Sequence, residues 1–458
     1  MSVDNDSPVN SSSSDDFAAL LDAELDSGSS DKSPDQGSSD DDEDIVAEAD
    51  ARKKRRTILE MDNGVQLDDS NSSGLDASAL DKPIKESCTH PGFLKDMCIG
   101  CGKRMDDGAR VGAGVAFGYI HKDLRLGSDE ISRLRDADVR TLLRHKKLYL
   151  VLDLDHTLLN STRLDDLSSE EDYLMSQTDS FEDISKGSLF RLDMIRMMTK
   201  LRPFIRTFLQ EASNMFEMYI YTMGERHYAL EMANLLDPGG LYFNSRVISQ
   251  ADCTQRHQKG LDVVLGVESA VLILDDTEAV WQKHKDNLIL MERYHYFSSS
   301  CRQFGFHCKS LSELKSDENE ADGSLATVLG VLKKIHGLFF DPEHENDFAA
   351  RDVRQVLKQI RKEILKGCKI AFSRVFPMKF QAAHHHLWKM AEQLGATCSV
   401  EVDSSVTHIV STDAGTEKSR WAFQNGKFLV HPKWLEASNY LWIRQPEEQF
   451  PVQQTKSK

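Results

Sequence analysis

The sequence predicts an α/β protein with two folded regions and a disordered acidic tail in front of them. Buried apolar strands alternate with helical patterns over residues 142–312, which indicates a parallel sheet covered on both faces. A shorter α/β pattern follows over residues 362–455. The first fifty residues hold sixteen acidic residues and one lysine, a composition that buries too little apolar surface to fold.

The tail is predicted to span residues 1–86, which are acidic and rich in serine. It carries most of the charge: the chain has 458 residues and a net charge of −18, so a tail segment at −15 leaves only −3 for the other 408. This nearly neutral body excludes electrostatic capture of nucleic acid by the whole protein, and we expect no direct nucleic-acid binding. No apolar run is long enough to span a membrane, and the acidic N-terminus does not resemble a signal peptide.

Five consecutive cations at Arg52–Arg56 interrupt the acidic tail. A basic cluster in a disordered segment is typical of recognition by a nuclear-import receptor or by nucleic acid, and we favour nuclear import, which predicts a nuclear protein. The alternative interpretation is a solvated run of charge without a partner.

A Cys/His segment is predicted over residues 87–103. Cys88, His90, Cys98 and Cys101 place four soft or borderline donors within fourteen residues, and a C-x₂-C pair with a nearby Cys and His suits a structural Zn²⁺. Free thiols in a flexible linker are the alternative. The chain has eight cysteines, which we expect to be reduced in a cytosolic or nuclear protein.

Four apolar runs predict the strands of the first folded region. They are Leu148–Asp153, Phe216–Thr222, Ala270–Asp275 and Leu288–Met291, with helices expected over 202–212 and 226–236. The three principal strands end in Asp153, Thr222 and Asp275. Because ligands of open α/β sheets bind beyond the carboxyl ends of the strands, these ends predict a site.

Two carboxylates at the end of the first strand are candidate catalytic and metal-binding groups. Asp153 and Asp155 stand at i and i+2, so in an extended chain they point the same way. Their mutual repulsion favours a cation, and Mg²⁺ prefers such oxygen ligands. The alternative is an acidic loop that caps the next helix.

Further groups downstream favour phosphoryl transfer. A second acid pair, Asp275 and Asp276, can complete a metal site, and Lys259 can neutralise the carboxylates. Thr222 and Arg202 supply a hydroxyl and a guanidinium suited to phosphoryl oxygens. Together with a carboxylate nucleophile, this set describes phosphoryl transfer.

The motifs that carry these residues resemble those of the haloacid-dehalogenase superfamily, phosphatase branch. Residues 150–159 (LVLDLDHTLL), 201–204 (LRPF), 219–224 (YIYTMG) and 273–281 (ILDDTEAVW) are similar to phosphatases that act on the heptad repeats of the largest RNA polymerase II subunit. The resemblance covers about residues 142–310. It implies a haloacid-dehalogenase-like sheet domain over 142–312 and a Mg²⁺-dependent protein serine phosphatase, with Mn²⁺ or Co²⁺ as substitutes.

The resemblance also implies a role for each matched residue. Asp153 becomes the nucleophile, and Asp155 the general acid and then base. Mg²⁺ is held by the side chains of Asp153 and Asp276 and the backbone carbonyl of Asp155, while Asp275 orients Lys259. The phosphoryl oxygens are then held by four residues: Thr157, Arg202, Thr222 and Lys259.

Two connecting segments are less clearly patterned. Residues 160–198 are long and acidic, and we expect either a flap over the site or a plain surface insertion. Residues 313–360 are expected to form a linker and a helix, the helix centred on 348–365.

The C-terminal region, predicted over 362–455, resembles a BRCT domain through residues 394–396 (LGA), 407–410 (THIV) and 426–434 (GKFLVHPKW). In members of that family that bind phosphopeptides, the phosphate is held at the positions of Ser373 and Lys418. Arg374 departs from the pattern, which has glycine there, so phosphopeptide binding and general protein docking both stay open. Trp434 is expected in the core.

These observations predict a nuclear phosphatase whose partners are the phosphorylated tail of RNA polymerase II and subunits of general transcription factors. A catalytically silent adaptor that binds phosphoproteins is the alternative, but such a protein has no need of Asp155. A phosphatase of small metabolites is disfavoured by the BRCT-like region and the basic cluster.

Overall fold

The computed structural model describes residues 88–104, 114–306, 308–341, 351–377 and 381–453. These residues belong to one compact unit, Cys88–Lys458. The predicted acidic tail and its basic cluster lie outside the described residues. No helix in the described part of the chain is long and apolar enough to cross a membrane.

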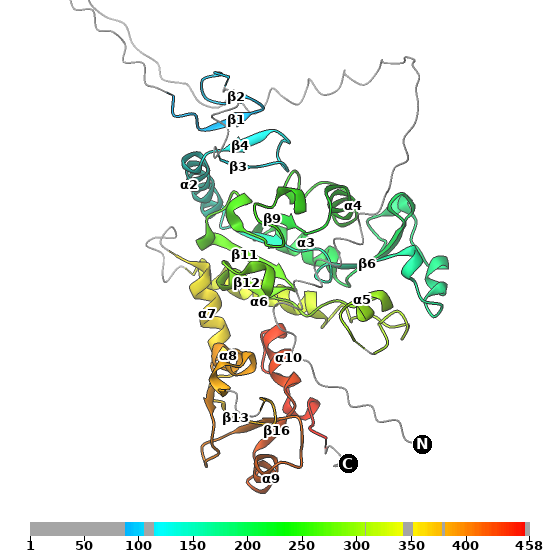
Figure 1. Cartoon of the computed structure of the whole chain (residues 1–458), viewed down its shortest axis with the longest axis vertical. Helices are drawn as coiled ribbons and strands as arrows, with labels where there is room; N and C mark the ends of the chain where they lie inside the picture. Colours follow the sequence, from blue (N-terminus) through cyan, green and yellow to red (C-terminus); the bar gives the residue numbers. More distant parts are fainter. Residues whose placement is uncertain (1–87, 105–113, 307, 342–350, 378–380, 454–458) are drawn as a thin grey trace, which may run out of the picture. The chain divides into compact units, whose positions relative to one another are not determined.

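A five-stranded parallel sheet forms the centre of the first folded region (Figure 1). Its strand order is β10-β9-β5-β11-β12. The strands are β5 (Leu148–Leu152), β9 (Phe216–Tyr221), β10 (Val247–Ile248), β11 (Val271–Asp275) and β12 (Leu288–Leu290). Every residue of β5 and β11 is buried, as expected for strands covered on both faces. The four strands expected from apolar runs are confirmed.

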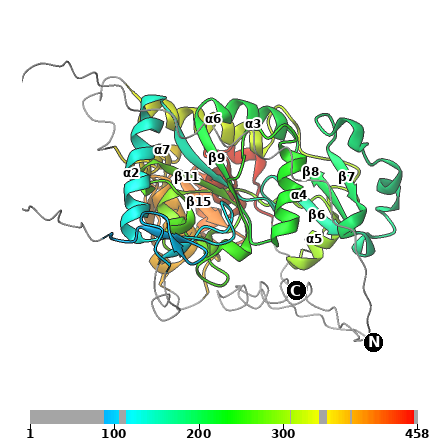
Figure 2. The same cartoon turned by 90° about the horizontal axis from the view of Figure 1, so that it is seen from above.

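Helices pack on this sheet through one continuous apolar core. The expected helices are α3 (Ile205–Ser213) and α4 (Arg226–Leu236). A third, α6 (Ser324–Phe339), packs against α3 and against α7 (Val353–Ile364), and Figure 2 shows α3 and α6 side by side. Over 313–360 we expected a linker followed by one helix, centred on 348–365; α7 matches that helix, whereas α6 lies where the linker was expected. Its buried face belongs to the core of the first folded region: Leu325, Val328, Leu329, Leu332, Ile335 and Phe339.

The segment between the first motif and Arg202 forms a small antiparallel sheet of its own. The order is β6-β8-β7, with β6 at Leu159–Arg163, β7 at Leu189–Leu192 and β8 at Met197–Leu201. The helix α5 (Ser298–Gln303) packs against β6. The segment is thus an ordered insertion with a regular strand pattern.

An antiparallel sheet precedes the central sheet, in the order β2-β1-β4-β3. Its strands are β1 (Gly92–Leu94), β2 (Met97–Cys98), β3 (Val115–Ala116) and β4 (Leu124–Leu126), followed by α2 (Ser128–Arg144). We name these four strands the N-terminal sheet.

The C-terminal region is a parallel sheet of order β14-β13-β15-β16 with three helices. The strands are β13 (Lys369–Ser373), β14 (Thr397–Ser399), β15 (His408–Ser411) and β16 (Phe428–Val430); the helices are α8 (His386–Gln393), α9 (Glu417–Gln424) and α10 (Lys433–Leu441). Trp434 is fully buried in its core, as expected.

Candidate active site

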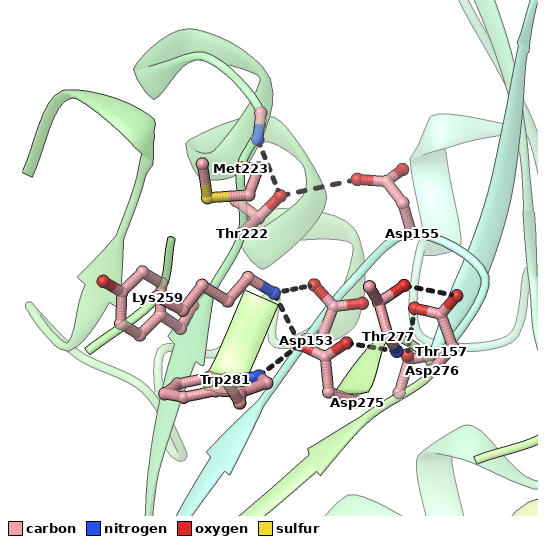
Figure 3. Close-up of polar contacts among 12 residues, drawn as sticks. Asp153, Asp155, Thr157, Thr222, Met223, Lys259, Asp275, Asp276, Thr277 and Trp281 are labelled. Carbon is pink, nitrogen blue, oxygen red and sulfur yellow. Dashed lines mark hydrogen bonds and ion pairs between the residues drawn. The ribbon is translucent and has the colours of Figure 1, made fainter. Parts of the chain in front are cut away.

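The ends of three neighbouring strands bring the predicted acids together. Asp153 directly follows β5, Asp275 is the last residue of the adjacent β11, and Thr222 follows β9 on the other side of β5. Because the strands are parallel, these ends share one edge of the sheet. Figure 3 shows their side chains converging there with Lys259.

The turn after β5 is held by its own backbone and by apolar anchors. The N–H groups of Thr157 and Leu158 both donate to the carbonyl of Leu154, and both leucines are fully buried. His156 takes a φ of 63°, which turns the chain sharply at this point. The turn therefore fixes where the side chains of Asp153 and Asp155 point.

Lys259 is the centre of the charge cluster. Its Nζ donates to Asp153 Oδ1 at 2.5 Å and to Asp275 Oδ2 at 2.6 Å. All three side chains are buried. Burial opposes the ammonium form, but Asp153 and Asp275 together hold the pKa of Lys259 above its ordinary value. Asp275 also accepts from Trp281 Nε1 at 2.8 Å, so this carboxylate is fixed from two sides.

Asp276 completes a cluster of three carboxylates. One oxygen each of Asp153, Asp275 and Asp276 lies within 4.8 Å of the other two. Asp276 accepts from Thr157 Oγ1 at 3.5 Å and from Arg293 Nε at 2.5 Å. This set of oxygen donors fits Mg²⁺.

The charge balance of the cluster also fits a divalent cation. With Asp155, four carboxylates face two cations, Lys259 and Arg293. Burial, followed by the neighbouring carboxylate of Asp275, raises the pKa of Asp153 well above its ordinary value. A divalent cation would favour the ionised form of Asp153 and offset the two excess negative charges.

Asp155 points away from the three clustered carboxylates. Its Oδ1 accepts from the Tyr228 hydroxyl at 2.5 Å and its Oδ2 from Thr222 Oγ1 at 3.4 Å. Burial raises the pKa of Asp155, and the hydrogen bond from Tyr228 opposes that rise. Thr222 is itself oriented by the N–H of Gly224 at 2.9 Å. Asp155 is thus a half-buried, positioned carboxyl group beside the cluster, as a general acid requires.

Arg202 does not join this cluster. Its side chain is fully buried, and its Nε and one terminal nitrogen donate to the two carboxylate oxygens of Glu318 at 3.0 and 2.6 Å. The other donors reach the backbone carbonyls of Thr157 at 3.0 Å and Glu292 at 3.1 Å. These contacts use four of the five N–H donors of Arg202 inside the fold, so the geometry favours a structural role, and the binding of a phosphoryl oxygen by Arg202 stays a prediction.

Three residues of the site were not predicted from the sequence. Tyr228 lies on α4, Arg293 follows β12, and Trp281 lies in a short turn after β11. No spacing signal marks Tyr228 or Arg293, because their partners lie 73 and 17 residues away. Trp281 belongs to a quoted motif, but only the fold reveals its bond to Asp275.

A cavity of about 410 Å³ opens beside the site. It is lined by Met223, which follows Thr222, and by Arg226, Arg256 and His257 among others. Arg256 is exposed and lies three residues before Lys259. The cavity therefore places the exposed guanidinium of Arg256 beside the catalytic edge, while that of Arg226 is bonded to Asp252 and to the carbonyl of Val247.

In the C-terminal domain, Ser373 and Lys418 both bond within the fold. Ser373 Oγ donates to Thr416 Oγ1 at 2.8 Å, and Lys418 Nζ donates to the carbonyls of Phe372 and Val400 at 3.1 and 2.7 Å. Arg374 has a φ of 52°, the region that favours glycine, and pairs with Asp413 at 2.9 Å. Phosphate binding at this place stays a prediction.

The fold and the cluster define a phosphatase of the haloacid-dehalogenase-like class. Residues 148–322 match the NLI interacting factor-like phosphatase family, and residues 361–439 match the BRCT (BRCA1 C Terminus) domain. The chain is 59% identical, over its whole length and 98% of the relative, to RNA polymerase II C-terminal domain phosphatase-like 4 of Arabidopsis thaliana.

Two further comparisons agree. RNA polymerase II C-terminal domain phosphatase-like 3 of the same plant is 42% identical over 71% of this chain and 28% of its own length. The solved structure of Fcp1, an essential RNA polymerase II CTD phosphatase, is 25% identical, with a TM-score of 0.55 over 70% of this chain and all of that one. The chain belongs to the family of RNA polymerase II C-terminal domain phosphatases.

Proposed function

We propose that this protein removes phosphate from serines in the heptad repeats of the largest RNA polymerase II subunit, in the nucleus and with Mg²⁺. The observation that carries the proposal is the buried contact of Lys259 with Asp153 and Asp275, beside Asp276. A carboxylate nucleophile, a fixed cation and an oxygen-rich metal site are the parts that phosphoryl transfer requires.

Asp153 is the nucleophile in this proposal. One of its oxygens attacks the phosphorus of a phosphoserine, the bond from phosphorus to the serine oxygen breaks, and the phosphoryl group passes to Asp153. Asp155 gives its proton to the departing serine oxygen. It then takes a proton from the water that attacks the aspartyl phosphate, which releases phosphate and restores Asp153.

The other residues bind and orient. In this proposal Lys259, Thr222 and Thr157, whose side chains gather at the catalytic edge in Figure 3, donate to the transferred phosphoryl oxygens. The side chains of Asp153 and Asp276 and the carbonyl of Asp155 would hold Mg²⁺, for which Mn²⁺ or Co²⁺ can stand in. When bound, that ion supplies positive charge that stabilises the oxygens of the phosphoryl group.

The cavity beside Thr222 supports a polyanionic peptide as substrate. The exposed Arg256 lines it, and a guanidinium group suits a further phosphate along a repeat. We expect Arg256→Ala to raise KM for a multiply phosphorylated heptad peptide several-fold and to leave kcat unchanged. Arg140→Ala, an exposed arginine of α2, is the matched control.

The experiment that tests the function is phosphate release from phosphorylated heptad peptides, with and without Mg²⁺. We expect metal-dependent turnover that falls by about 10³-fold or more in Asp153→Asn. Asp136→Asn removes an exposed carboxylate of α2 and should leave turnover unchanged. No turnover by the native protein, with retained binding of phosphopeptides, would favour the silent adaptor.

The partners outside the active site are part of the same proposal. The BRCT domain is expected to dock a phosphorylated partner or a general transcription factor subunit, and the basic cluster at 52–56 to direct nuclear import. A chain lacking residues 52–56 that still enters the nucleus would refute the second expectation.

A further inference from the structure

A second group of metal ligands lies at the start of the described chain, far in sequence from the catalytic acids. Cys88 and His90 precede β1, Cys98 ends β2, and Cys101 lies in the following turn. One ligand atom from each of the four residues lies within 4.8 Å of the other three. All of these cysteines are free thiols.

The spacing of these atoms is that of ligands around one tetrahedral zinc ion. Zn–S bonds of about 2.3 Å and a Zn–N bond of about 2.05 Å give edges of about 3.8 Å between two sulfurs and about 3.6 Å between sulfur and nitrogen. Cys88 Sγ lies 3.8 Å from Cys98 Sγ. Cys101 Sγ lies 3.6 Å from His90 Nδ1. A disulfide needs sulfurs about 2.05 Å apart, so these distances suit a shared metal instead.

The backbone is arranged to hold thiolates. The N–H of His90 donates to Cys88 Sγ at 3.4 Å, and the N–H of Gly100 donates to Cys98 Sγ at 3.3 Å. The turn between Cys98 and Cys101 closes when the N–H of Gly102 donates to the carbonyl of Cys98 at 2.9 Å. Gly102 has a φ of 70°, which glycine adopts without strain. N–H donors around ligand sulfurs are the supporting contacts expected at a metal site.

The surrounding segment has almost no apolar core. Among the described residues 88–104, only Gly92 and Cys98 are buried. The apolar side chains of Leu94, Met97 and Ile99 are 41%, 55% and 45% exposed. Apolar burial therefore does not explain why this hairpin is ordered, whereas a metal ion supplies folding free energy to such small elements.

We propose that Cys88, His90, Cys98 and Cys101 bind one structural Zn²⁺ that holds the N-terminal sheet together. The three thiolates and one imidazole are the Cys₃His set of closed zinc sites. The ion is separate from the Mg²⁺ of the active site, whose ligands are carboxylate oxygens.

The N-terminal sheet is linked to the segment that carries Lys259. β1 pairs with β4, and the N–H of Gly127 at the start of α2 donates to the carbonyl of Pro91 at 2.8 Å. On α2, Arg135 donates to the carbonyls of residues 261, 262 and 264 at 2.6–3.2 Å. Tyr119, which lies between β3 and β4, donates to the carbonyl of Val263 at 2.9 Å. The zinc ion thus stabilises the sheet and helix that hold residues 261–264, which follow Lys259.

The first test is the metal content of the full-length chain, measured by mass spectrometry. We expect about one zinc per chain, falling below about 0.2 in Cys101→Ser, whose sulfur is exposed and whose loss spares the core. Cys308→Ser, another exposed cysteine, and Asp276→Asn at the catalytic cluster should both keep one zinc. A native chain without zinc, or a Cys101→Ser chain that keeps its full complement, would overturn the proposal.

Two further measurements test the site and its link to residues 261–264, and the first of them uses only the native chain. Co²⁺ in place of zinc in the native chain should give the intense visible bands of tetrahedral thiolate coordination, and their absence would count against the site. Hydrogen exchange of residues 261–264 should be faster in Cys101→Ser than in Cys308→Ser. Equal exchange in both would refute the link to the Lys259 segment.

Discussion

The pair of Arg202 and Glu318 offers a direct test of whether this arginine belongs to the fold or to the substrate site. Arg202 is fully buried and makes two hydrogen bonds to Glu318 and two to backbone carbonyls. Removing one partner of a buried ion pair leaves an uncompensated charge or unfilled donors, which costs about 3–5 kcal/mol. We therefore expect Arg202→Met and Glu318→Gln each to destabilise the protein by at least about 3 kcal/mol.

The assay is thermal unfolding of both single variants and of the double variant Arg202→Met/Glu318→Gln. At about 2–4 °C per kcal/mol for a unit of 150–250 residues, each single change lowers Tm by about 6–12 °C. The decrease in Tm of the double variant should be smaller than the sum of the decreases in the two single variants, because neither charge is then left buried alone.

Activity separates the two interpretations of Arg202. If its role is structural, Arg202→Met keeps kcat/KM within about tenfold at a temperature where it is folded, the residual loss arising at the Thr157 carbonyl that Arg202 holds. A donor to the transferred phosphoryl group would instead cost about 10²–10³-fold. A large loss of kcat/KM with Tm unchanged and additive effects in the double variant would refute our reasoning.

Three further outcomes are expected. In a metal titration of activity, Asp276→Asn should raise the Mg²⁺ concentration for half-maximal turnover about tenfold or more, which is equivalent to about 1.4 kcal/mol. An unchanged titration would contradict the place of Asp276 among the metal ligands. Tyr228→Phe removes a hydrogen bond to Asp155 that is worth about 1–1.5 kcal/mol. We therefore expect kcat to fall about tenfold with KM unchanged. A change in KM alone would contradict this role of Tyr228. Burial lowers the pKa of His295 to about 3, so between about pH 6.5 and 3 the unfolded state binds more protons and stability falls as pH falls. The drop in Tm from pH 7.5 to pH 5 should therefore be smaller in His295→Gln than in the native chain.

The sequence predicts those parts of the site that depend on strand ends. Each of the three principal apolar runs ends in a polar residue, and parallel strands bring such ends to one edge, so the pattern alone is enough to place Asp153, Thr222 and Asp275 together. Contacts between residues far apart in the sequence could not be predicted in this way. Glu318 lies 116 residues after Arg202, and nothing local shows that the chain returns to neutralise it.

The helix α6 escapes prediction for a different reason. Its apolar residues recur at helical spacing from Leu325 to Phe339, a pattern that predicts a helix. The acidic residues before it and the glycines at 330 and 337 favour a linker if composition is weighed first. Packing against α3 and α7 outweighs the propensity cost of those glycines, because tertiary burial contributes more than local preference.

Lys259 links the catalytic cluster to the N-terminal sheet. Its ammonium group donates to Asp153 and Asp275. The backbone carbonyls of residues 261 and 263, shortly after Lys259, accept from Arg135 and Tyr119. The ion pairs of Lys259 with Asp153 and Asp275 involve the charged groups of the catalytic cluster. The hydrogen bonds from Arg135 and Tyr119 involve only backbone carbonyls of the segment that follows Lys259. A loss of zinc should therefore loosen the position of Lys259 without changing its charge, which predicts a lower kcat with the Mg²⁺ dependence intact. A loss of Asp276 should instead change the Mg²⁺ dependence, because its carboxylate is a proposed Mg²⁺ ligand. The effects of the two metals can therefore be distinguished by kinetics in the same protein.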